Sequence, residues 1–312
     1  MDQEKNKQST ARGAKKAKLR LDIALIDKGL FDNRKEAQAA IMDGAVLVNN
    51  QKVTKPGVSV SSDDCIELRP GFARRKYVSR GGYKLEKAIE QFAIDVQGRI
   101  CLDIGASTGG FTDCLLKNGA ARVYAIDVGY GQLDWSLRHH DRVTVLEKTN
   151  ARYLSASDLY KDDEPPASLA VIDCSFISLS KIVPAVINLL DARSSEIVCL
   201  VKPQFEAGRR AVVKGVVKDA DEHKHVLEEI LSMSQSLGLK ARALTYSPIK
   251  GPKGNIEYLI LLDLGKTEAA GHAGRPPAPL DVDALVHEAV KTLQDKRKSE
   301  TSDDFFAAHE DA

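Results

Sequence analysis

The chain has 312 residues, of which 43% are apolar and 29% charged, and its 45 Lys and Arg residues balance 44 Asp and Glu residues. This length suits one large or two modest domains, and the composition allows a sizeable hydrophobic core. No run of about 18 uncharged apolar residues occurs, which argues against a membrane-spanning segment. The first residues lack the apolar stretch of an export signal, so we expect a cytoplasmic protein.

The near-zero net charge is an average over three unlike segments. Residues 1–80 hold 17 Lys and Arg against 10 Asp and Glu, residues 81–266 hold 23 against 24, and residues 267–312 hold 5 against 10. A basic end followed by a neutral body favours contact of the first segment with a polyanion. For residues 1–18 taken alone, we favour a disordered, solvated basic tail.

The cysteines and histidines show no spacing that is typical of a metal site, so we expect no bound metal. The five cysteines are scattered, and several lie in apolar runs: Cys65, Cys101, Cys114, Cys174 and Cys199. We interpret them as reduced, buried thiols, as expected for a cytoplasmic protein.

Residues 19–68 show the pattern of a small α+β unit. Apolar residues at helical spacing around Leu21 to Leu25, followed by Gly29, predict a first helix. Residues 34–42 predict a second helix, with Asn33 as its N-cap and Glu36 as the partner in a capping box. Residues 45–48, 51–53 and 65–68 predict three strands, of which the first two are joined by an Asn-Asn turn.

Two segments of this unit, RKEA at residues 34–37 and DGAVLVN at residues 43–49, resemble the RNA-binding domain named for ribosomal small-subunit protein S4. The resemblance implies binding to structured RNA through phosphate contacts and shape. The expected RNA-binding residues are Arg20, Arg34, Lys35, Lys52 and Lys55. The alternative is that these residues form an ordinary solvated face. Such a domain carries no chemistry, so a reaction must be sought further along the chain.

Residues 69–80 (RPGFARRKYVSR) show no sustained period and predict a linker to a second domain at residues 81–266. This domain opens with a helical pattern at residues 85–92. Apolar strand candidates then stand at residues 100–104, 123–126, 143–146, 169–172, 197–201 and 258–262, separated by helical segments near residues 111–117, 133–139, 182–190 and 223–237. The alternation predicts a parallel α/β sheet covered on both faces, with ligands at the carboxyl ends of its strands.

The end of the first strand of this sheet predicts a cofactor loop. The segment LDIGASTGGF at residues 102–111 has the spacing Gly105-x-x-x-Gly109-Gly110, which does not fit G-x-G-x-x-G, and it lacks the Lys-Ser/Thr ending of the P-loop. It resembles motif I of class I S-adenosylmethionine methyltransferases, D-x-G-x-x-x-G-G. Asp127 ends the second strand, where a carboxylate can bind ribose hydroxyl groups.

The resemblance implies a class I methyltransferase Rossmann-like fold and S-adenosylmethionine as the cofactor. The expected cofactor-binding residues are Asp103, Gly105, Ser107, Thr108, Gly109, Gly110, Phe111, Asp127, Val128 and Asn150. Asn150 follows the third strand, where such enzymes often hold the adenine, but a polar loop residue is equally well explained as a simple turn former.

Four charged residues fall at the expected ligand edge of the sheet: Lys84, Asp173, Lys202 and Glu257. Each one alone is compatible with an ordinary solvent-facing strand end. A buried unpaired charge is costly, so their convergence on one cleft would indicate mutual pairing and chemistry. Together they match the Lys-Asp-Lys-Glu tetrad of the FtsJ-like ribose 2′-O-methyltransferases.

The tetrad resemblance implies catalytic roles for these four residues. Methyl transfer to a ribose 2′-hydroxyl requires alignment of the reacting atoms and loss of the hydroxyl proton. Lys202 is the preferred general base, with Lys84 supplying a neighbouring positive charge. Asp173 is expected to orient Lys202, and Glu257 to hold Lys84 or the ribose.

In chain order, the S4-type unit, the linker and the motifs of the second domain resemble the TlyA family over residues 19–264. This implies an enzyme that methylates cytidine ribose 2′-oxygens of ribosomal RNA, although members often carry the name haemolysin. The alternatives are a non-catalytic RNA-binding assembly factor, disfavoured by the intact tetrad, and a membrane-active protein, disfavoured by composition. Residues 267–312 depart from the family and predict an acidic, mostly disordered extension with a short helix near residues 282–293.

Overall fold

The computed structural model describes residues 18–70, 72, 76–161, 164–208, 210–265 and 280–293. The chain forms two compact units, residues 1–74 and residues 75–312. The predicted basic tail lies outside the described residues except for Lys18. Four positions of the predicted linker, residues 71 and 73–75, also lie outside them, as do residues 266–279 and 294–312.

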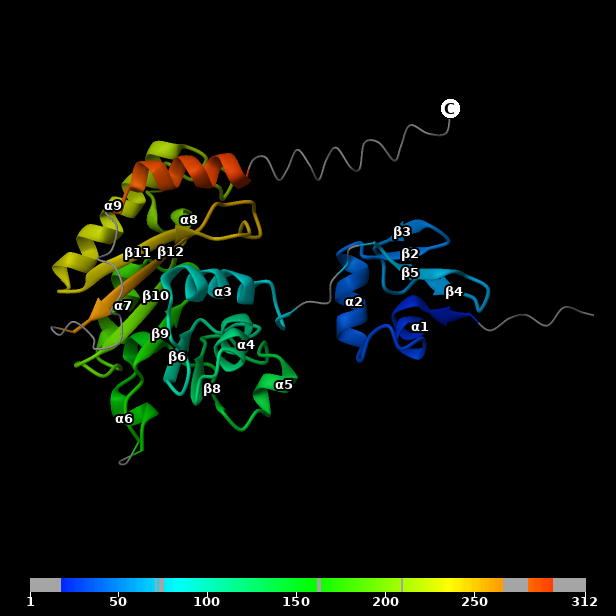
Figure 1. Ribbon diagram of the computed structural model, residues 1–312, viewed down its shortest axis with the longest axis horizontal. Helices are drawn as coiled ribbons and strands as arrows, with labels where there is room; N and C mark the ends of the chain where they lie inside the picture. The colour runs from blue at the N-terminus through cyan, green and yellow to red at the C-terminus, as the bar shows by residue number, and fades with distance from the viewer. Residues whose placement is uncertain are drawn as a thin grey trace, which may run out of the picture. The chain divides into compact units, whose positions relative to one another are not determined.

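Among its described residues, the N-terminal unit has two helices and five short strands (Figure 1). They are β1 (Leu19–Arg20), α1 (Leu21–Asp27), α2 (Arg34–Met42), β2 (Val46–Val48), β3 (Gln51–Val53), β4 (Ser59–Val60) and β5 (Ile66–Leu68). Strand β2 lies between β3 and β5 in an antiparallel sheet, and β1 pairs with β4. The sequence predicted both helices and the three-stranded sheet. It missed the β1–β4 pair because two-residue strands are too short for a hydrophobic pattern.

Local residue chemistry explains the boundaries of these elements. Asn33 caps α2, since its Oδ1 accepts a hydrogen bond of 2.9 Å from the Glu36 backbone N–H and its Nδ2 donates to the Glu36 carboxylate at 2.8 Å. Asn49 and Asn50 adopt φ values of 52° and 64°, as a two-residue hairpin turn with right-handed twist requires. Leu21, Leu25 and Ile41 are fully buried between the helices and the strands.

The larger unit is built on a seven-stranded sheet in the order β11-β12-β10-β9-β6-β7-β8. Its strands are β6 (Ile100–Ile104), β7 (Arg122–Ile126), β8 (Val143–Leu146), β9 (Leu169–Ile172), β10 (Ser195–Val201), β11 (Lys240–Tyr246) and β12 (Tyr258–Leu264). The strands from β6 to β10 pair in parallel, whereas β12 runs antiparallel to both of its neighbours. The prediction of a parallel sheet was therefore wrong at β12. Strand β11 was missed because an edge strand that is only partly buried shows a weak apolar pattern.

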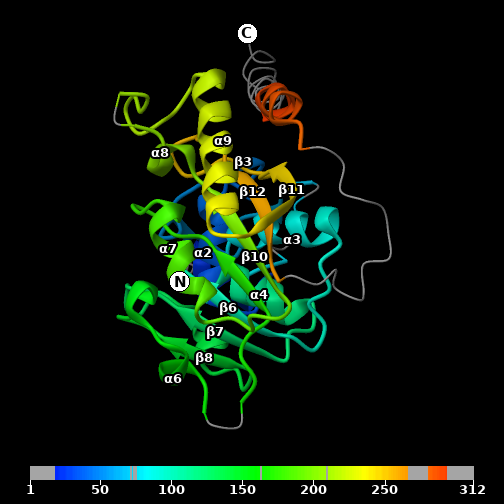
Figure 2. The ribbon, with the colours of Figure 1, turned by 90° about the vertical axis from the view of Figure 1, so that its left-hand side faces the viewer.

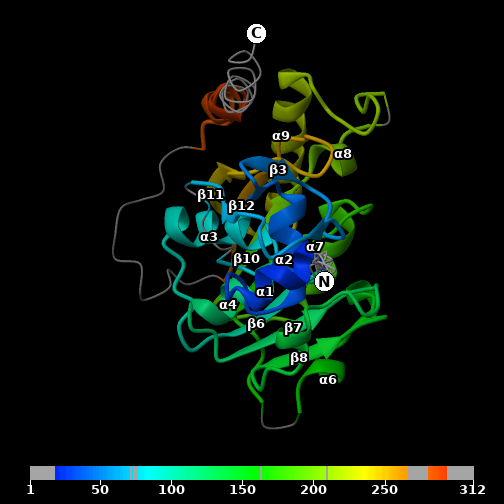
Figure 3. The same cartoon turned by 90° about the vertical axis from the view of Figure 1, so that its right-hand side faces the viewer.

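Helices cover both faces of the sheet, as predicted. The helices are α3 (Gly81–Phe92), α4 (Gly110–Lys117), α5 (Trp135–Arg138), α6 (Ala156–Leu159), α7 (Leu179–Ile187), α8 (Pro203–Glu206) and α9 (Ala220–Ser236), with a 3-10 turn at Ala151–Tyr153. Successive side chains of β10 alternate between two core clusters, one with α3, α4 and α5 and the other with α6, α7 and α9. Figures 2 and 3 show α3 and α7 on opposite sides of the strands.

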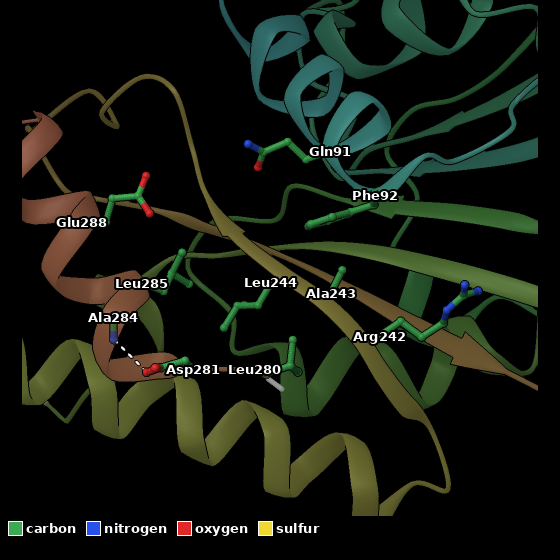
Figure 4. Close-up of a pocket in the computed structure, with 10 residues that line it drawn as sticks. All are labelled: Gln91, Phe92, Arg242, Ala243, Leu244, Leu280, Asp281, Ala284, Leu285 and Glu288. Carbon is green, nitrogen blue, oxygen red and sulfur yellow. Dashed lines mark hydrogen bonds between the residues drawn. The ribbon is translucent and has the colours of Figure 1, made fainter. Parts of the chain in front are cut away.

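A further helix at residues 282–293 belongs to the core of this unit. Its Val286, Ala289 and Leu293 side chains are at most 3% exposed and join the cluster that contains α7 and α9. Asp283 forms an ion pair of 2.7 Å with Lys224 of α9. The predicted helix is therefore present. It packs in the core, although it lies within the segment that was predicted to be mostly disordered. A cavity of about 490 Å³ lies between this helix, β11 and the end of α3 (Figure 4).

Three of the cysteines fit the prediction of buried thiols, namely Cys101, Cys114 and Cys199. The prediction was wrong for Cys65, which is exposed, and Cys174 is only partly buried. Cys65 directly precedes β5, the closing strand of the N-terminal unit, and this strand is itself only partly buried.

Candidate active site

The antiparallel direction of β12 brings two of the four charged residues together. Tyr258, the first residue of β12, pairs with Val201, the last residue of β10. Glu257 therefore lies beside Lys202 at one edge of the sheet, although Glu257 precedes its strand and Lys202 follows its own. Asp173 follows β9, the parallel neighbour of β10, and therefore lies at the same edge of the sheet.

The four side chains form a continuous series of alternating charge. Lys202 Nζ lies 2.5 Å from Asp173 Oδ1, Lys84 Nζ lies 4.0 Å from Asp173 Oδ2, and Lys84 Nζ lies 2.6 Å from Glu257 Oε2. Lys84, Lys202 and Glu257 are at most 8% exposed. Two ammonium and two carboxylate groups balance each other, which offsets the cost of burying them.

Two polar side chains that the sequence analysis did not single out hold this series in place. Ser175 Oγ accepts a hydrogen bond of 2.9 Å from Lys202 Nζ, and Gln204 Nε2 donates to Glu257 Oε1 at 3.4 Å. Each stands two positions after a predicted site residue, Asp173 or Lys202. Ser175 lies in the loop after β9, and Gln204 lies in the short helix α8 after β10. Their places just after strand ends are the signal from which they could have been found.

A cavity of about 850 Å³ adjoins the four charged residues. Its wall includes Ser107, Thr108 and Phe111 of the glycine loop. Phe176 lines the same cavity with 90% of its surface exposed and a φ of 65°, which is rare for an aromatic residue. Its ring lies 5.0 Å from that of Phe205, also in the wall. The cavity thus combines a glycine loop, a charged series and an open aromatic face.

The glycines of the loop allow close contact between protein segments. A Cβ atom on Gly105, whose φ is 88°, would lie 2.8 Å from the Asp173 carbonyl oxygen. A Cβ atom on Gly110 would lie 2.3 Å from Ser79 Oγ and 2.8 Å from the Gly82 nitrogen. Gly105 therefore lets the loop approach the end of β9, and Gly110 lets α4 approach the start of α3, the helix that carries Lys84.

Asp103 lies beneath this loop as a fully buried carboxyl group. Thr112 Oγ1 donates a hydrogen bond of 2.6 Å to Asp103 Oδ2, while Oδ1 has no hydrogen-bond partner among the described residues. Burial raises the pKa of Asp103 to about 7, despite the opposing effect of the Thr112 hydrogen bond. A cationic group bound nearby would favour the ionised form.

The remaining predicted cofactor residues, namely Gly109, Asp127, Val128 and Asn150, do not line the 850 Å³ cavity. Asp127 accepts hydrogen bonds from the backbone N–H groups of Ser107 at 2.7 Å and Gly129 at 2.6 Å, so it joins two loops. Val128 is 71% exposed. Asn150 Oδ1 accepts from the Arg152 N–H at 3.1 Å, the geometry of a turn former. Gly109 faces Leu137 rather than the cavity.

The five predicted RNA-binding residues are all exposed in the N-terminal unit: Arg20, Arg34, Lys35, Lys52 and Lys55. Arg20 and Arg34 both form ion pairs with Asp22, a buried residue that the sequence analysis did not consider. The alkyl chain of Lys52 lies over Gly44, whose missing side chain makes room for it.

Two family models match the chain. Residues 77–264 match the FtsJ-like methyltransferase family, and residues 19–66 match the S4 domain. The chain is 44% identical to the putative rRNA methyltransferase YqxC of Bacillus subtilis, over 90% of this chain and 97% of that protein. It is 43% identical to the 16S/23S rRNA (cytidine-2'-O)-methyltransferase TlyA of Mycobacterium tuberculosis, over 78% of this chain and 89% of that protein.

The chain belongs to the TlyA family of FtsJ-like methyltransferases. Among solved structures, a putative hemolysin from Streptococcus thermophilus matches with a TM-score of 0.69 and 39% identity, covering 90% of this chain and 98% of that one. The predictions of a TlyA-family methyltransferase fold with an S4 domain are thereby confirmed. Among the described residues, no helix is long and apolar enough to cross a membrane, and no three His, Cys, Asp or Glu side chains are grouped to hold a metal ion.

Proposed function

We propose that this TlyA-family enzyme transfers a methyl group from S-adenosylmethionine to a ribose 2′-hydroxyl, that of a cytidine in ribosomal RNA, and that it does so in the cytoplasm. The observation that carries the proposal is the alternating series of Lys202, Asp173, Lys84 and Glu257 beside the cavity and its glycine loop. The names of the relatives supply the RNA class and the nucleotide.

The residues around the glycine loop fit the cofactor. Its ammonium and sulfonium groups are cationic, and the loop region offers Asp103, whose buried Oδ1 has no partner within the described residues. Asp127, at the end of β7, offers a carboxylate for the ribose hydroxyl groups of the cofactor, and Ser107 and Thr108 offer hydroxyl groups in the cavity wall. When bound, S-adenosylmethionine supplies an electrophilic methyl group on sulfur.

The four charged residues include a group that can accept the proton of the ribose hydroxyl. Lys84 contacts two carboxylates, whereas Lys202 contacts one carboxylate and the Ser175 hydroxyl. Lys202 Nζ is therefore our candidate for accepting the proton of the 2′-hydroxyl, in line with the family resemblance, while Lys84 supplies the neighbouring positive charge. Asp173 fixes the position of Lys202, and Glu257 fixes that of Lys84.

The aromatic face of the cavity suits a nucleotide taken out of its stack. Phe176 is 90% exposed beside the charged series, and a base can stack on its ring while the ribose reaches Lys202. The S4 domain adds exposed basic residues for capture of the RNA backbone. The chain therefore offers separate groups for RNA capture, nucleotide placement and proton transfer.

The test is methyl transfer from labelled S-adenosylmethionine to ribosomal subunits and to purified ribosomal RNA. After alkaline hydrolysis we expect the label in resistant dinucleotides, because a 2′-O-methyl group blocks cleavage of the phosphodiester bond at its nucleotide. After complete digestion of the RNA to nucleosides, we expect the label in cytidine. Lys202→Ala should lose at least about 100-fold in rate, the range for a general base, while still binding cofactor. Lys181→Ala, which removes an exposed lysine on α7, is the matched control.

Three results would contradict parts of the proposal. A folded, cofactor-binding protein that labels no ribosomal substrate would favour a non-catalytic RNA-binding factor. Label recovered in mononucleotides after alkaline hydrolysis would point to methylation of a base rather than a ribose. Full activity of Lys202→Ala together with loss of activity in Lys84→Ala would transfer the role of base to Lys84.

A further inference from the structure

The N-terminal unit contains a buried carboxylate that contacts two of its exposed basic residues. Asp22 has no exposed surface, yet it stands two positions after Arg20, a residue predicted to bind RNA. A negative charge near a polyanion weakens binding through simple electrostatics. Its presence among exposed basic residues therefore calls for another role.

Asp22 is the meeting point of two arginines from different elements. Arg20, at the end of β1, donates from Nε and Nη2 to the two carboxylate oxygens of Asp22, both at 3.0 Å. Arg34, the first residue of α2, donates from Nε to Asp22 Oδ2 at 2.9 Å. Gln38, one turn later on α2, donates to the same oxygen at 2.7 Å. The carboxylate thus ties β1 and α1 to α2.

These contacts fix the directions of both guanidinium groups. A guanidinium is planar, so the two parallel hydrogen bonds from Arg20 set its plane as well as its position. Gly57 lies against the Arg20 guanidinium on its other side, because a Cβ atom on this glycine would lie 3.3 Å from Arg20 Nη1. Both arginine side chains stay about half exposed, at 46% for Arg20 and 53% for Arg34.

Each guanidinium carries more N–H groups than Asp22 receives. Arg34 donates only its Nε hydrogen to Asp22, so its two terminal amino groups take no part in this contact. The hydrogen bonds from Arg20 hold the pKa of Asp22 well below its usual range, against the effect of burial, with Gln38 and Arg34 acting in the same direction. The carboxylate is therefore ionised at neutral pH.

We propose that Asp22 is a positioning residue that holds Arg20 and Arg34 as a preorganised clamp for RNA phosphate groups. The clamp rests on the proposed function, since it assumes that the S4 domain of this chain captures ribosomal RNA. Two guanidinium groups fixed on one carboxylate lose little side-chain entropy when a phosphate binds. Two unrestrained arginines would have the same charge but would lose more on binding.

The proposal and plain electrostatics predict opposite signs for one substitution. Asp22→Asn removes a negative charge, so electrostatics alone predicts tighter binding of every RNA. The clamp predicts weaker binding of ribosomal RNA, by about tenfold, because Arg20 and Arg34 lose their common anchor. Binding of a structureless RNA such as poly-uridine should be unchanged or tighter, because it needs no fixed geometry.

Asp27→Asn is the matched control, since it removes one negative charge from an exposed position of the same helix. Both variants and the unaltered full-length protein are compared for dissociation constants with purified ribosomal RNA and with poly-uridine across a series of salt concentrations. For Asp22→Asn we expect a salt slope lower by about 1, as for the loss of a phosphate contact. Methylation should show a raised KM for RNA with an unchanged kcat, because Asp22 carries no chemistry.

Gly57→Ala tests the clamp without changing charge and without removing a buried group. Its Cβ would press on the Arg20 guanidinium, and we expect ribosomal RNA affinity to fall severalfold with poly-uridine binding unchanged. This variant decides the matter if Asp22→Asn fails to fold, as judged by circular dichroism. A Gly57→Ala protein with unaltered affinity would then overturn the clamp.

The outcomes separate this proposal from the proposed function. If the unaltered protein neither binds nor methylates ribosomal RNA, the proposed function fails and the clamp fails with it. If the unaltered protein does both, and folded Asp22→Asn binds ribosomal RNA as tightly as Asp27→Asn does, only the clamp is overturned.

Discussion

Removal of the helix at residues 282–293 should destabilise the methyltransferase unit, although the sequence suggested that this region is an appendage. The perturbation is a chain that ends at residue 281. Such a chain keeps every strand and every labelled helix but exposes the surface that Val286, Ala289 and Leu293 cover. It also loses the ion pair between Asp283 and Lys224, which is exposed and contributes little.

The expected size of the effect follows from the buried side chains. Full burial of a Val or Leu side chain contributes about 1.5–3 kcal/mol each, and the Ala methyl group about 0.8 kcal/mol. The loss is therefore about 4–7 kcal/mol, as an upper range because the unfolded chain also buries some surface. Since a domain is stable by only about 5–15 kcal/mol, the midpoint of thermal unfolding should fall by about 10 °C or more.

Thermal unfolding followed by circular dichroism measures this effect. A chain that ends at residue 293 is the control, because it keeps all of the described contacts and should unfold like the full chain. Leu293→Ala should reproduce part of the loss, about 2–5 kcal/mol, whereas Lys291→Ala, at an exposed position of the same helix, should have little effect. Equal unfolding temperatures for the chains ending at 281 and 293 would refute the assignment of this helix to the core.

Three further predictions concern ligands. Phe176→Ala should raise KM for RNA by about 5-fold to 100-fold without changing the unfolding temperature, because the ring is exposed and only its stacking on a base is lost; an unchanged KM in a steady-state methylation assay would exclude the ring from the substrate site. The affinity for S-adenosylmethionine should rise by up to about tenfold per pH unit as the pH approaches 7 and level off above pH 7, because the pKa of Asp103 is raised to about 7 and the cationic cofactor favours the ionised form. Calorimetry on Asp103→Asn should show that this pH dependence is lost. If the pH dependence persists in this variant, another group is responsible for it. Removal of residues 1–68 should weaken RNA binding and flatten its salt dependence while leaving cofactor affinity unaltered, as equilibrium binding can measure, and unchanged RNA affinity would assign RNA capture to the larger unit.

Local sequence patterns predicted most elements of this fold. Helix α2 begins and ends at the predicted residues, because an Asn cap and an apolar face are encoded within a few consecutive positions. The five parallel strands were each predicted within a few residues, since buried strands are continuous apolar runs. Residues directly after such strands are likewise visible in the sequence, which is why Asp173 and Lys202 could be singled out.

The contacts that complete the candidate site required the tertiary structure. The direction of β12 sets Glu257 beside Lys202, and strand direction depends on the connection and on pairing with distant residues rather than on the strand's own sequence. Ser175 and Gln204 became visible only through their hydrogen bonds to the charged series. Motif glycines such as Gly110 proved to allow contact between helices, which a cofactor motif alone does not reveal.

The sequence by itself determined the two domains, their fold classes and the identity of the charged residues at the sheet edge, because these properties are encoded in short-range patterns and motifs. Only the tertiary structure decided which charges pair, that Asp22 joins Arg20 to Arg34, and that the helix at residues 282–293 is part of the core. The physical reason is that burial and pairing depend on neighbours far away in the chain, and an exposed and a buried acid look alike until those neighbours are in place.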